Sequence, residues 1–427
     1  MFRSILIASF AAVSLAQNYA TNGDPQLDAY IRDANGRSPA VRQAFAKYQS
    51  SLERLPQASA LPEPVVGVTQ YVRSPETRVG PQTTMLSVSQ AFPWFGKLSD
   101  KEKIAAKEAQ VFREYYEAQQ DEVIRQVKLA YYSLAFIDRA ITITGEDLSL
   151  IQQYETLAQA RYSQGQGLQQ AVIKLQAEIT RDQNRLDDLR SQRVDAEAML
   201  NTVMDRPANS PILRVAILAR PKVAVDYQAL HALATRARPE VLGALLQIER
   251  DEKRIQLAQK SYWPDFSVGA SFTNVNGRSD LGPGVMPPSQ NGKNIFAVSA
   301  TVSIPIRRRK YDAAIQEATE DQIAAREGYR NVVNSIEGAV RGIGFRIGTL
   351  EEQIALFEKT LLPQAEQALA STEVAYSTGT LGVLDLLDSE RFLLNMRLGL
   401  AQYISDYMKS LAEMERAIGA PFPEVTP

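Results

Sequence analysis

The chain has 427 residues, with 47 Lys and Arg against 49 Asp and Glu, one His and no Cys. A formal net charge of -2 provides no general attraction for nucleic acid. Without Cys there is no disulfide, thiolate nucleophile, Cys-ligated metal or lipidated N-terminal Cys. The lone His231 makes a histidine metal site or a Ser-His-Asp mechanism a poor hypothesis. No apolar run of about 18 residues follows the N-terminal region, so no transmembrane helix is expected.

Residues 1–20 have the three-part pattern of a secretory signal. Arg3 precedes an apolar stretch over 5–13, and small residues follow, with cleavage expected after Ala16 or Ala20. The alternative interpretation is a buried N-terminal helix. The pattern predicts export to the cell envelope, and the lack of Cys predicts that the exported protein is not a lipoprotein.

Four short motifs occur twice in the same order, which indicates an internal duplication. The prolines at 39, 62 and 93 match those at 239, 264 and 305, with offsets of 200, 202 and 212. Two Tyr-Ser-x-Gly sequences end at Gly165 and Gly379, with an offset of 214. Most of the drift arises between the second and third motifs, where the loop over 276–294 is longer than the loop over 73–83.

The duplicated unit is predicted to be a helix, two strands, a long helix, a turn and a helix. The first unit is expected over 21–220, with strands at about 64–72 and 84–92 and helices at about 98–163 and 167–204. The second is expected over 221–427, with strands at about 264–275 and 295–305 and helices at about 310–377 and 381–419. The fold class is therefore mainly α with a small β part.

The predicted strands carry apolar residues on one face and small polar residues on the other. Phe266, Val268, Ala270 and Phe272 alternate with Ser267, Gly269 and Ser271, and the run over 296–304 alternates in the same way. Strands of about 9–11 residues with this pattern suit lipid on one side and water on the other. A soluble antiparallel sheet with one face on a core has the same alternation. Aromatic residues at the strand ends, as at a membrane interface, favour the lipid-facing interpretation.

Four strands cannot close a transmembrane barrel, which needs about eight, and open strand edges are not tolerated in lipid. Several copies must therefore pool their strands, and three copies would supply 3 × 4 = 12.

Between the strands and the Tyr-Ser-x-Gly sequences, apolar residues recur at heptad spacing, for example at 123, 127, 130, 134, 137 and 141. These stretches predict long antiparallel coiled-coil helices. Pro363 is expected to kink or break the second one.

The combination of these features resembles the TolC-like outer-membrane efflux protein family. The most characteristic segments are Gln90–Lys97 (QAFPWFGK) and Tyr376–Asp388 (YSTGTLGVLDLLD), and the similarity covers nearly the whole mature chain. The resemblance implies a homotrimer with a 12-stranded outer-membrane barrel continued by a periplasmic tunnel of helices. It also implies docking to a periplasmic adaptor protein and an inner-membrane transporter of the RND type. The Phe-Pro-Trp-Phe-Gly-Lys variant resembles the branch associated with heavy-metal and related cation efflux.

Glycine at each Tyr-Ser-x-Gly turn accepts the positive φ of a helix C-terminus, so both turns are predicted to reverse the chain between paired helices. In the implied tunnel these turns are tips that face the adaptor, and a purely structural turn is the alternative for each residue. The predicted docking residues are Ser163, Gln164, Gly165, Leu168, Ser377, Thr378, Gly379 and Leu381. The predicted strand-to-helix transitions are at Pro93, Gly96 and Pro305.

Asp385 and Asp388 are spaced i, i+3 and so share one helix face just after the second tip. By resemblance they match the family's aperture aspartates, and Tyr376 matches a tyrosine of its closed-state latch. Three copies would place 3 × 2 = 6 carboxylates around one entrance, a ring that favours cations. Leu381 replaces the family's latch arginine and Ala171 its acidic partner, so the charged latch is not expected here.

The leading functional hypothesis is the outer-membrane duct of a tripartite efflux system. A duct for protein secretion driven by an ATP-binding-cassette transporter has the same fold, and the sequence does not separate the two. A coiled-coil scaffold without a pore is a third hypothesis. An enzyme is the weakest, because no acid, base, nucleophile, metal or cofactor motif is recognised, and no cofactor is expected.

Overall fold

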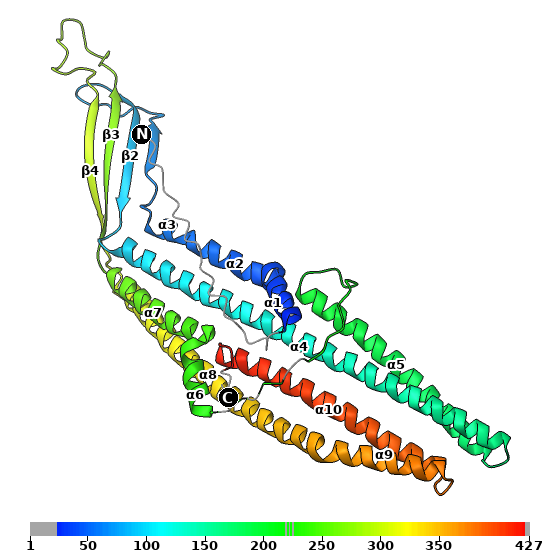
Figure 1. The fold of residues 1–427 in the computed structure, drawn as a ribbon. Helices are drawn as coiled ribbons and strands as arrows, with labels where there is room; N and C mark the ends of the chain where they lie inside the picture. The colour runs from blue at the N-terminus through cyan, green and yellow to red at the C-terminus, as the bar shows by residue number, and fades with distance from the viewer. Residues whose placement is uncertain (1–23, 218–219, 222, 224–225, 423–427) are drawn as a thin grey trace. The chain divides into compact units, whose positions relative to one another are not determined.

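The computed structural model describes residues 24–217, 220–221, 223 and 226–422 (Figure 1). The predicted signal sequence over 1–20 lies outside these residues. The chain divides into two compact units, each built from both halves of the sequence. The sheet unit contains Ala46–Arg113 and Gly243–Arg330, and the helical unit contains Met1–Phe45, Glu114–Leu242 and Asn331–Pro427.

The elements follow one another in the same order in the two halves. The first half contains α1 (Pro25–Arg37), α2 (Pro39–Leu52), α3 (Arg54–Ser59), β1 (Val65–Gln70), β2 (Gln82–Phe92), α4 (Lys97–Ser163) and α5 (Gln169–Val203). The second contains α6 (Tyr227–Ala237), α7 (Pro239–Lys260), β3 (Asp265–Val275), β4 (Ile295–Ser303), α8 (Arg308–Leu356), the π-helical turn η1 (Phe357–Leu361), α9 (Leu362–Ser377) and α10 (Val383–Ile418).

The four strands form one antiparallel sheet in the order β1-β2-β3-β4. The register aligns Leu86 with Phe272 and Phe272 with Phe296, so the apolar residues of neighbouring strands lie on one face. Ser87 and Ser271 are paired in the same way on the opposite face. The alternation in the sequence therefore becomes a sheet with one apolar and one small polar face.

The two outer strands of this sheet, β1 and β4, have one unpaired edge each. All residues of β4 are exposed, and so are most residues of β1. Val66 and Val68 in β1 are 72% and 69% exposed, and Phe296 and Val298 in β4 are both 70% exposed. The sheet unit thus presents large apolar side chains and free backbone groups that a single chain does not cover.

The helical unit packs its apolar residues along the seam that the heptad spacing predicts. In α4, Val123, Val127, Leu134 and Ile137 are buried, as is Ala130. The sixth seam position, at 141, is only half-buried, and Ile143 is buried beyond it. In the described part of the chain, no helix is long and apolar enough to cross a membrane.

The second long helix is interrupted near Pro363, as expected. The α-helical pattern of α8 ends at Leu356, and the π-helical turn η1 leads into α9, where Pro363 is among the first residues. Proline has no N–H to donate and its ring displaces the preceding carbonyl, so the backbone adopts wider i→i+5 bonding there. Phe357 packs on Tyr403 of α10 at this turn, with ring centroids 5.1 Å apart.

A buried ion pair fixes α4 to α10 inside the helical unit. Lys128 of α4 donates to Glu415 of α10, and the side chains are 2% and 6% exposed. Burial raises the pKa of Glu415, against the opposing effect of the Lys128 charge. The buried negative charge of Glu415 therefore depends on the positive charge of Lys128 beside it.

We expect Lys128→Met to destabilise the helical unit by about 3–5 kcal/mol, because it leaves a buried carboxylate without its partner. The double variant Lys128→Met/Glu415→Leu should regain most of that loss. Thermal denaturation in detergent, followed by circular dichroism, measures both. Lys103→Met, on an exposed part of the same helix, is the control and should leave the midpoint nearly unchanged. A midpoint as high for Lys128→Met as for the control would contradict the role of the pair.

Candidate functional site

Two helix hairpins end in matched turns in the helical unit. The turn between α4 and α5 has Gly165 at φ +71°, and the turn between α9 and α10 has Gly379 at φ +77°. In each turn the backbone bonds back onto the preceding helix, with Gly165 N donating to Tyr162 O and Gly379 N donating to Tyr376 O at 3.0 and 3.1 Å. The left-handed backbone explains the choice of glycine at both positions.

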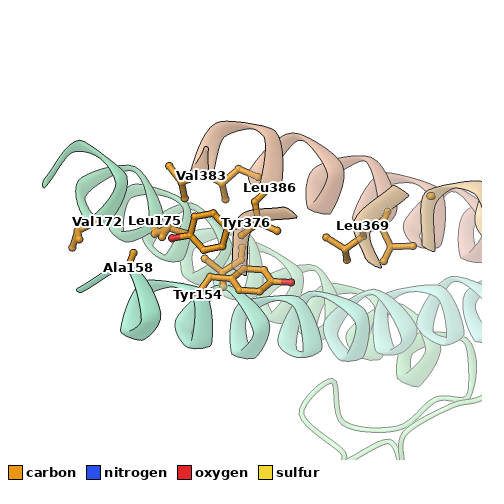
Figure 2. Close-up of a cluster of buried hydrophobic side chains, with 12 residues drawn as sticks. Tyr154, Ala158, Val172, Leu175, Leu369, Tyr376, Val383 and Leu386 are labelled. Carbon is orange, nitrogen blue, oxygen red and sulfur yellow. The ribbon is translucent and has the colours of Figure 1, made fainter. Parts of the chain in front are cut away.

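An apolar cluster joins the two hairpins next to the turns (Figure 2). Tyr376 of α9 is 7% exposed and lies among residues of the other three helices, including Leu175 of α5 and Leu386 of α10. Burial raises the pKa of Tyr376, so its phenol stays neutral. The residue predicted to belong to a latch is thus an interior residue of the contact between the hairpins.

Arg161, in the last turn of α4, bonds the end of α9. Its guanidinium donates to the carbonyls of Tyr376 at 2.7 Å and Ser377 at 2.6 Å, and lies 4.8 Å from the centre of the Tyr376 ring. It therefore gives a second donor to the Tyr376 carbonyl, which already accepts from Gly379 N, bonds the Ser377 carbonyl at the helix end, and adds a cation–π contact. Sequence reasoning missed Arg161, although it directly precedes the first Tyr-Ser-x-Gly sequence; nothing in that sequence reveals a partner 215 residues away.

The two predicted gate aspartates lie on the first turns of α10, and both are exposed. Asp385 caps this helix, since its Oδ2 accepts a hydrogen bond from Gly382 N at 3.1 Å. Among the described residues, neither aspartate forms a hydrogen bond with Tyr376. Of the two residues predicted to replace the family's charged latch, Leu381 is 42% exposed and Ala171 is half-buried.

The residues predicted to dock an adaptor share one property, which is exposure. Leu168 is 73% exposed, an unusual position for a large apolar side chain. The other exposed members of the set are Ser163, Gln164, Gly165, Ser377, Thr378, Gly379 and Leu381. These side chains are available to a partner.

The predicted strand-to-helix transitions lie in the sheet unit. Pro93 follows the last residue of β2, and Gly96, at φ +82°, precedes the first residue of α4. Lys97 then donates to Asp265 at the start of β3, at 2.8 Å, while Trp94 and Trp263 stack with centroids 5.1 Å apart. Pro305 follows β4 by two residues, and α8 begins at Arg308.

The comparisons with known proteins agree with this architecture. The sequence profile of the family described as "Outer membrane efflux protein" matches residues 30–205 and 230–420. The chain is 19% identical to nodulation protein T of Rhizobium leguminosarum bv. trifolii, over 97% of this chain and 90% of the relative. It is 24% identical to the outer membrane protein TolC of Vibrio cholerae, over 74% of this chain and 72% of that protein. The crystal structure of the outer membrane protein VceC from Vibrio cholerae matches 93% of this chain and 97% of its own, with a TM-score of 0.74 and 18% identity.

Fold and sequence together define a TolC-like outer-membrane channel, and not an enzyme. The chain belongs to the outer membrane efflux protein family.

We expect Arg161→Met to loosen the end of α9, because two charge-assisted hydrogen bonds are worth about 1.5–3 kcal/mol each when buried and less at this half-exposed site. Hydrogen–deuterium exchange of the amides over 372–380 should accelerate roughly tenfold, which corresponds to about 1.4 kcal/mol. The control is Arg190→Met on α5, whose ion pair with Asp187 is exposed. Equal exchange in both variants would show that Arg161 does not stabilise the end of α9.

Proposed function

We propose that three copies of this chain form an outer-membrane duct that passively conducts substrates of an inner-membrane pump to the cell exterior. The observation that carries the proposal is the four-stranded sheet, with its two unpaired edges and its exposed apolar face. Unpaired backbone groups cost several kcal/mol each in lipid, so such a sheet enters a membrane only when further strands close it. Three copies pair β1 of one with β4 of the next and give a 12-stranded barrel.

The long helices continue this duct on the periplasmic side in the proposal. The helical hairpins supply its wall, and their turns form the end that meets a periplasmic adaptor. The exposed side chains of both turns, Leu168 and Leu381 among them, are the proposed adaptor contacts. The outer membrane of a Gram-negative-type envelope, reached through the predicted signal sequence, is the location that this arrangement requires.

The narrow entrance is proposed to be ringed by Asp385 and Asp388. Both side chains are exposed on one face of α10, and three copies supply six carboxylates. Such a ring raises the local concentration of cations and repels anions. It is consistent with cation substrates, which the Phe-Pro-Trp-Phe-Gly-Lys motif also suggests.

Secretion of proteins by an ATP-binding-cassette transporter uses the same kind of duct, so the inner-membrane partner decides between the two functions. In-cell cross-linking, followed by mass spectrometry of the captured inner-membrane component, identifies that partner. A proton-driven RND pump with its adaptor supports efflux. An ATP-binding-cassette transporter instead assigns the duct to secretion.

We expect cysteines on the two faces of the sheet to react differently with a membrane-impermeant thiol reagent. Ser271→Cys and Ser303→Cys, on the polar face, should be labelled in intact outer membranes because that face lines water. Phe272→Cys and Val302→Cys, on the apolar face, should remain unlabelled because lipid covers them. The chain contains no other Cys, so each variant carries a single reactive site. The reverse pattern would mean that the polar face is outside.

In planar bilayers, Asp385→Asn/Asp388→Asn should reduce cation selectivity and weaken block by multivalent cations, because the ring loses its negative charge. Asparagine keeps an oxygen acceptor for Gly382 N, so the helix cap is preserved. Asp195→Asn, an exposed change on α5, should conduct like the wild type. Unchanged selectivity in the double variant would remove these residues from the entrance, and a protein without conductance would contradict the duct itself.

A further inference from the structure

Three carboxyl groups from three helices meet in the interior of the helical unit. They are Asp147 of α4, Asp182 of α5 and Glu390 of α10, with residues 9%, 1% and 1% exposed. Interactions with the other two carboxyl groups shift the pKa of Asp147, and Asp147 in turn shifts theirs. The cluster therefore connects the α4–α5 hairpin of the first repeat with a helix of the second.

Protons are needed to make these contacts favourable. When all three groups are ionised, both carboxylate oxygens of Asp182 and of Glu390 lack a hydrogen-bond donor among the described residues. A shared proton turns each carboxylate pair into a hydrogen-bonded pair and removes the repulsion between like charges. Burial, together with the hydrogen bond and charge of Glu390, raises the pKa of Asp147 to about 8. Burial and the neighbouring Asp147 raise the pKa of Asp182 to about 7, and burial also raises the pKa of Glu390.

Positive charges near the cluster oppose its protonation but do not outweigh burial. The charge of Arg185 lowers the pKa of Asp147 and of Asp182, and that of Arg391 lowers the pKa of Glu390, yet all three pKa values remain raised. On α5, Arg185 approaches Asp182 only to 3.8 Å and is 37% exposed. Arg391 of α10 and Arg181 of α5 both bond Glu178 instead, and these hydrogen bonds lower the pKa of Glu178 in spite of its burial. Tyr154 of α4 donates to Glu373 of α9, which adds another negative charge nearby. Arg185 thus pairs with Asp182 through charge without a hydrogen bond, while Arg181 and Arg391 are bonded to Glu178.

We propose that Asp147, Asp182 and Glu390 form a proton-dependent clamp between the α4–α5 hairpin and α10. Shared protons hold the three helices together, and loss of the protons weakens the contact.

The direction of the pH effect follows from proton linkage. A carboxyl group that separates into water has a pKa near 4, whereas in the packed helices it retains its proton up to about pH 7–8. The packed state therefore binds more protons, and its stability falls as the pH rises from about 4 to 8 and levels off above that. If the hairpin ends form the periplasmic entrance, a role that rests on the proposed function, acid holds this entrance closed and mild alkali loosens it.

Hydrogen–deuterium exchange of the purified full-length protein tests the clamp without requiring a pore. Between pH 5.5 and 7.5, protection factors of amides over 143–150, 178–186 and 386–394 should fall at least about tenfold, since each released proton contributes up to tenfold per pH unit. In Asp182→Asn/Glu390→Gln the amide groups donate to Asp147 without titrating. The protection factors of this variant should change less than about threefold over the same range.

Asp187→Asn is the matched control, because Asp187 lies on α5 but is exposed, and it should keep the wild-type pH dependence. The single variant Glu390→Gln should show an intermediate slope and replaces the double variant if that one does not fold. Flat wild-type protection, or a full slope in the double variant, would overturn the clamp. If exchange depends on pH as described but the protein shows no bilayer conductance, the clamp is supported and the proposed duct is refuted.

Discussion

The unpaired edges of a short antiparallel sheet are the constraint on which the proposed organisation depends. β1 and β4 expose backbone hydrogen-bonding groups together with valine and phenylalanine side chains that one chain cannot cover. In water this combination leads to aggregation, and in lipid it is excluded. Association of several copies satisfies the edges and the apolar face at once. The proposed trimeric duct is such an association, and the family to which the chain belongs favours it.

Duplication gives each half the same sequence of elements, but the contacts that matter most connect one half with the other. The sheet joins the strands of the two halves edge to edge, since β2 of the first half pairs with β3 of the second. In the helical unit, Lys128 reaches Glu415, and Arg161 reaches the end of α9. Any movement of one hairpin relative to the other must therefore break polar contacts between the repeats, so a small number of side chains controls it.

These contacts differ in how they respond to their surroundings. Arg161 bonds two backbone carbonyl groups, which do not titrate. The carboxyl cluster of Asp147, Asp182 and Glu390 responds to pH because its stability depends on bound protons. The strength of the Arg161 contact is thus independent of bound protons, whereas the strength of the carboxyl cluster changes with pH. In the proposed duct, Leu381 and Ala171 are predicted to replace the charged latch. The Arg161 contact and the carboxyl cluster would then hold the hairpins together.

The sequence by itself determined the elements, because their signals are local. Alternation with period two predicted the strands and their faces, and heptad spacing predicted the long helices. Pro363 predicted the irregularity that the structure shows as a π-helical turn within a continuous helix. The positive φ of Gly165 and Gly379 likewise follows from the turn that each residue occupies. Motif similarity, as well as local pattern, singled out Asp385 and Asp388, whose proposed role at the entrance depends on other copies of the chain.

Only the tertiary structure decided which distant residues meet. An arginine before a turn and an aspartate within a helix are ordinary in sequence, because their partners lie up to 243 residues away, the separation of Glu390 from Asp147 (390 − 147 = 243). Burial was equally hidden, since polar residues in a long amphipathic helix normally face water. The properties of Arg161 and of the carboxyl cluster arise from the packing of helices from both halves, and that packing depends on interactions across the whole chain.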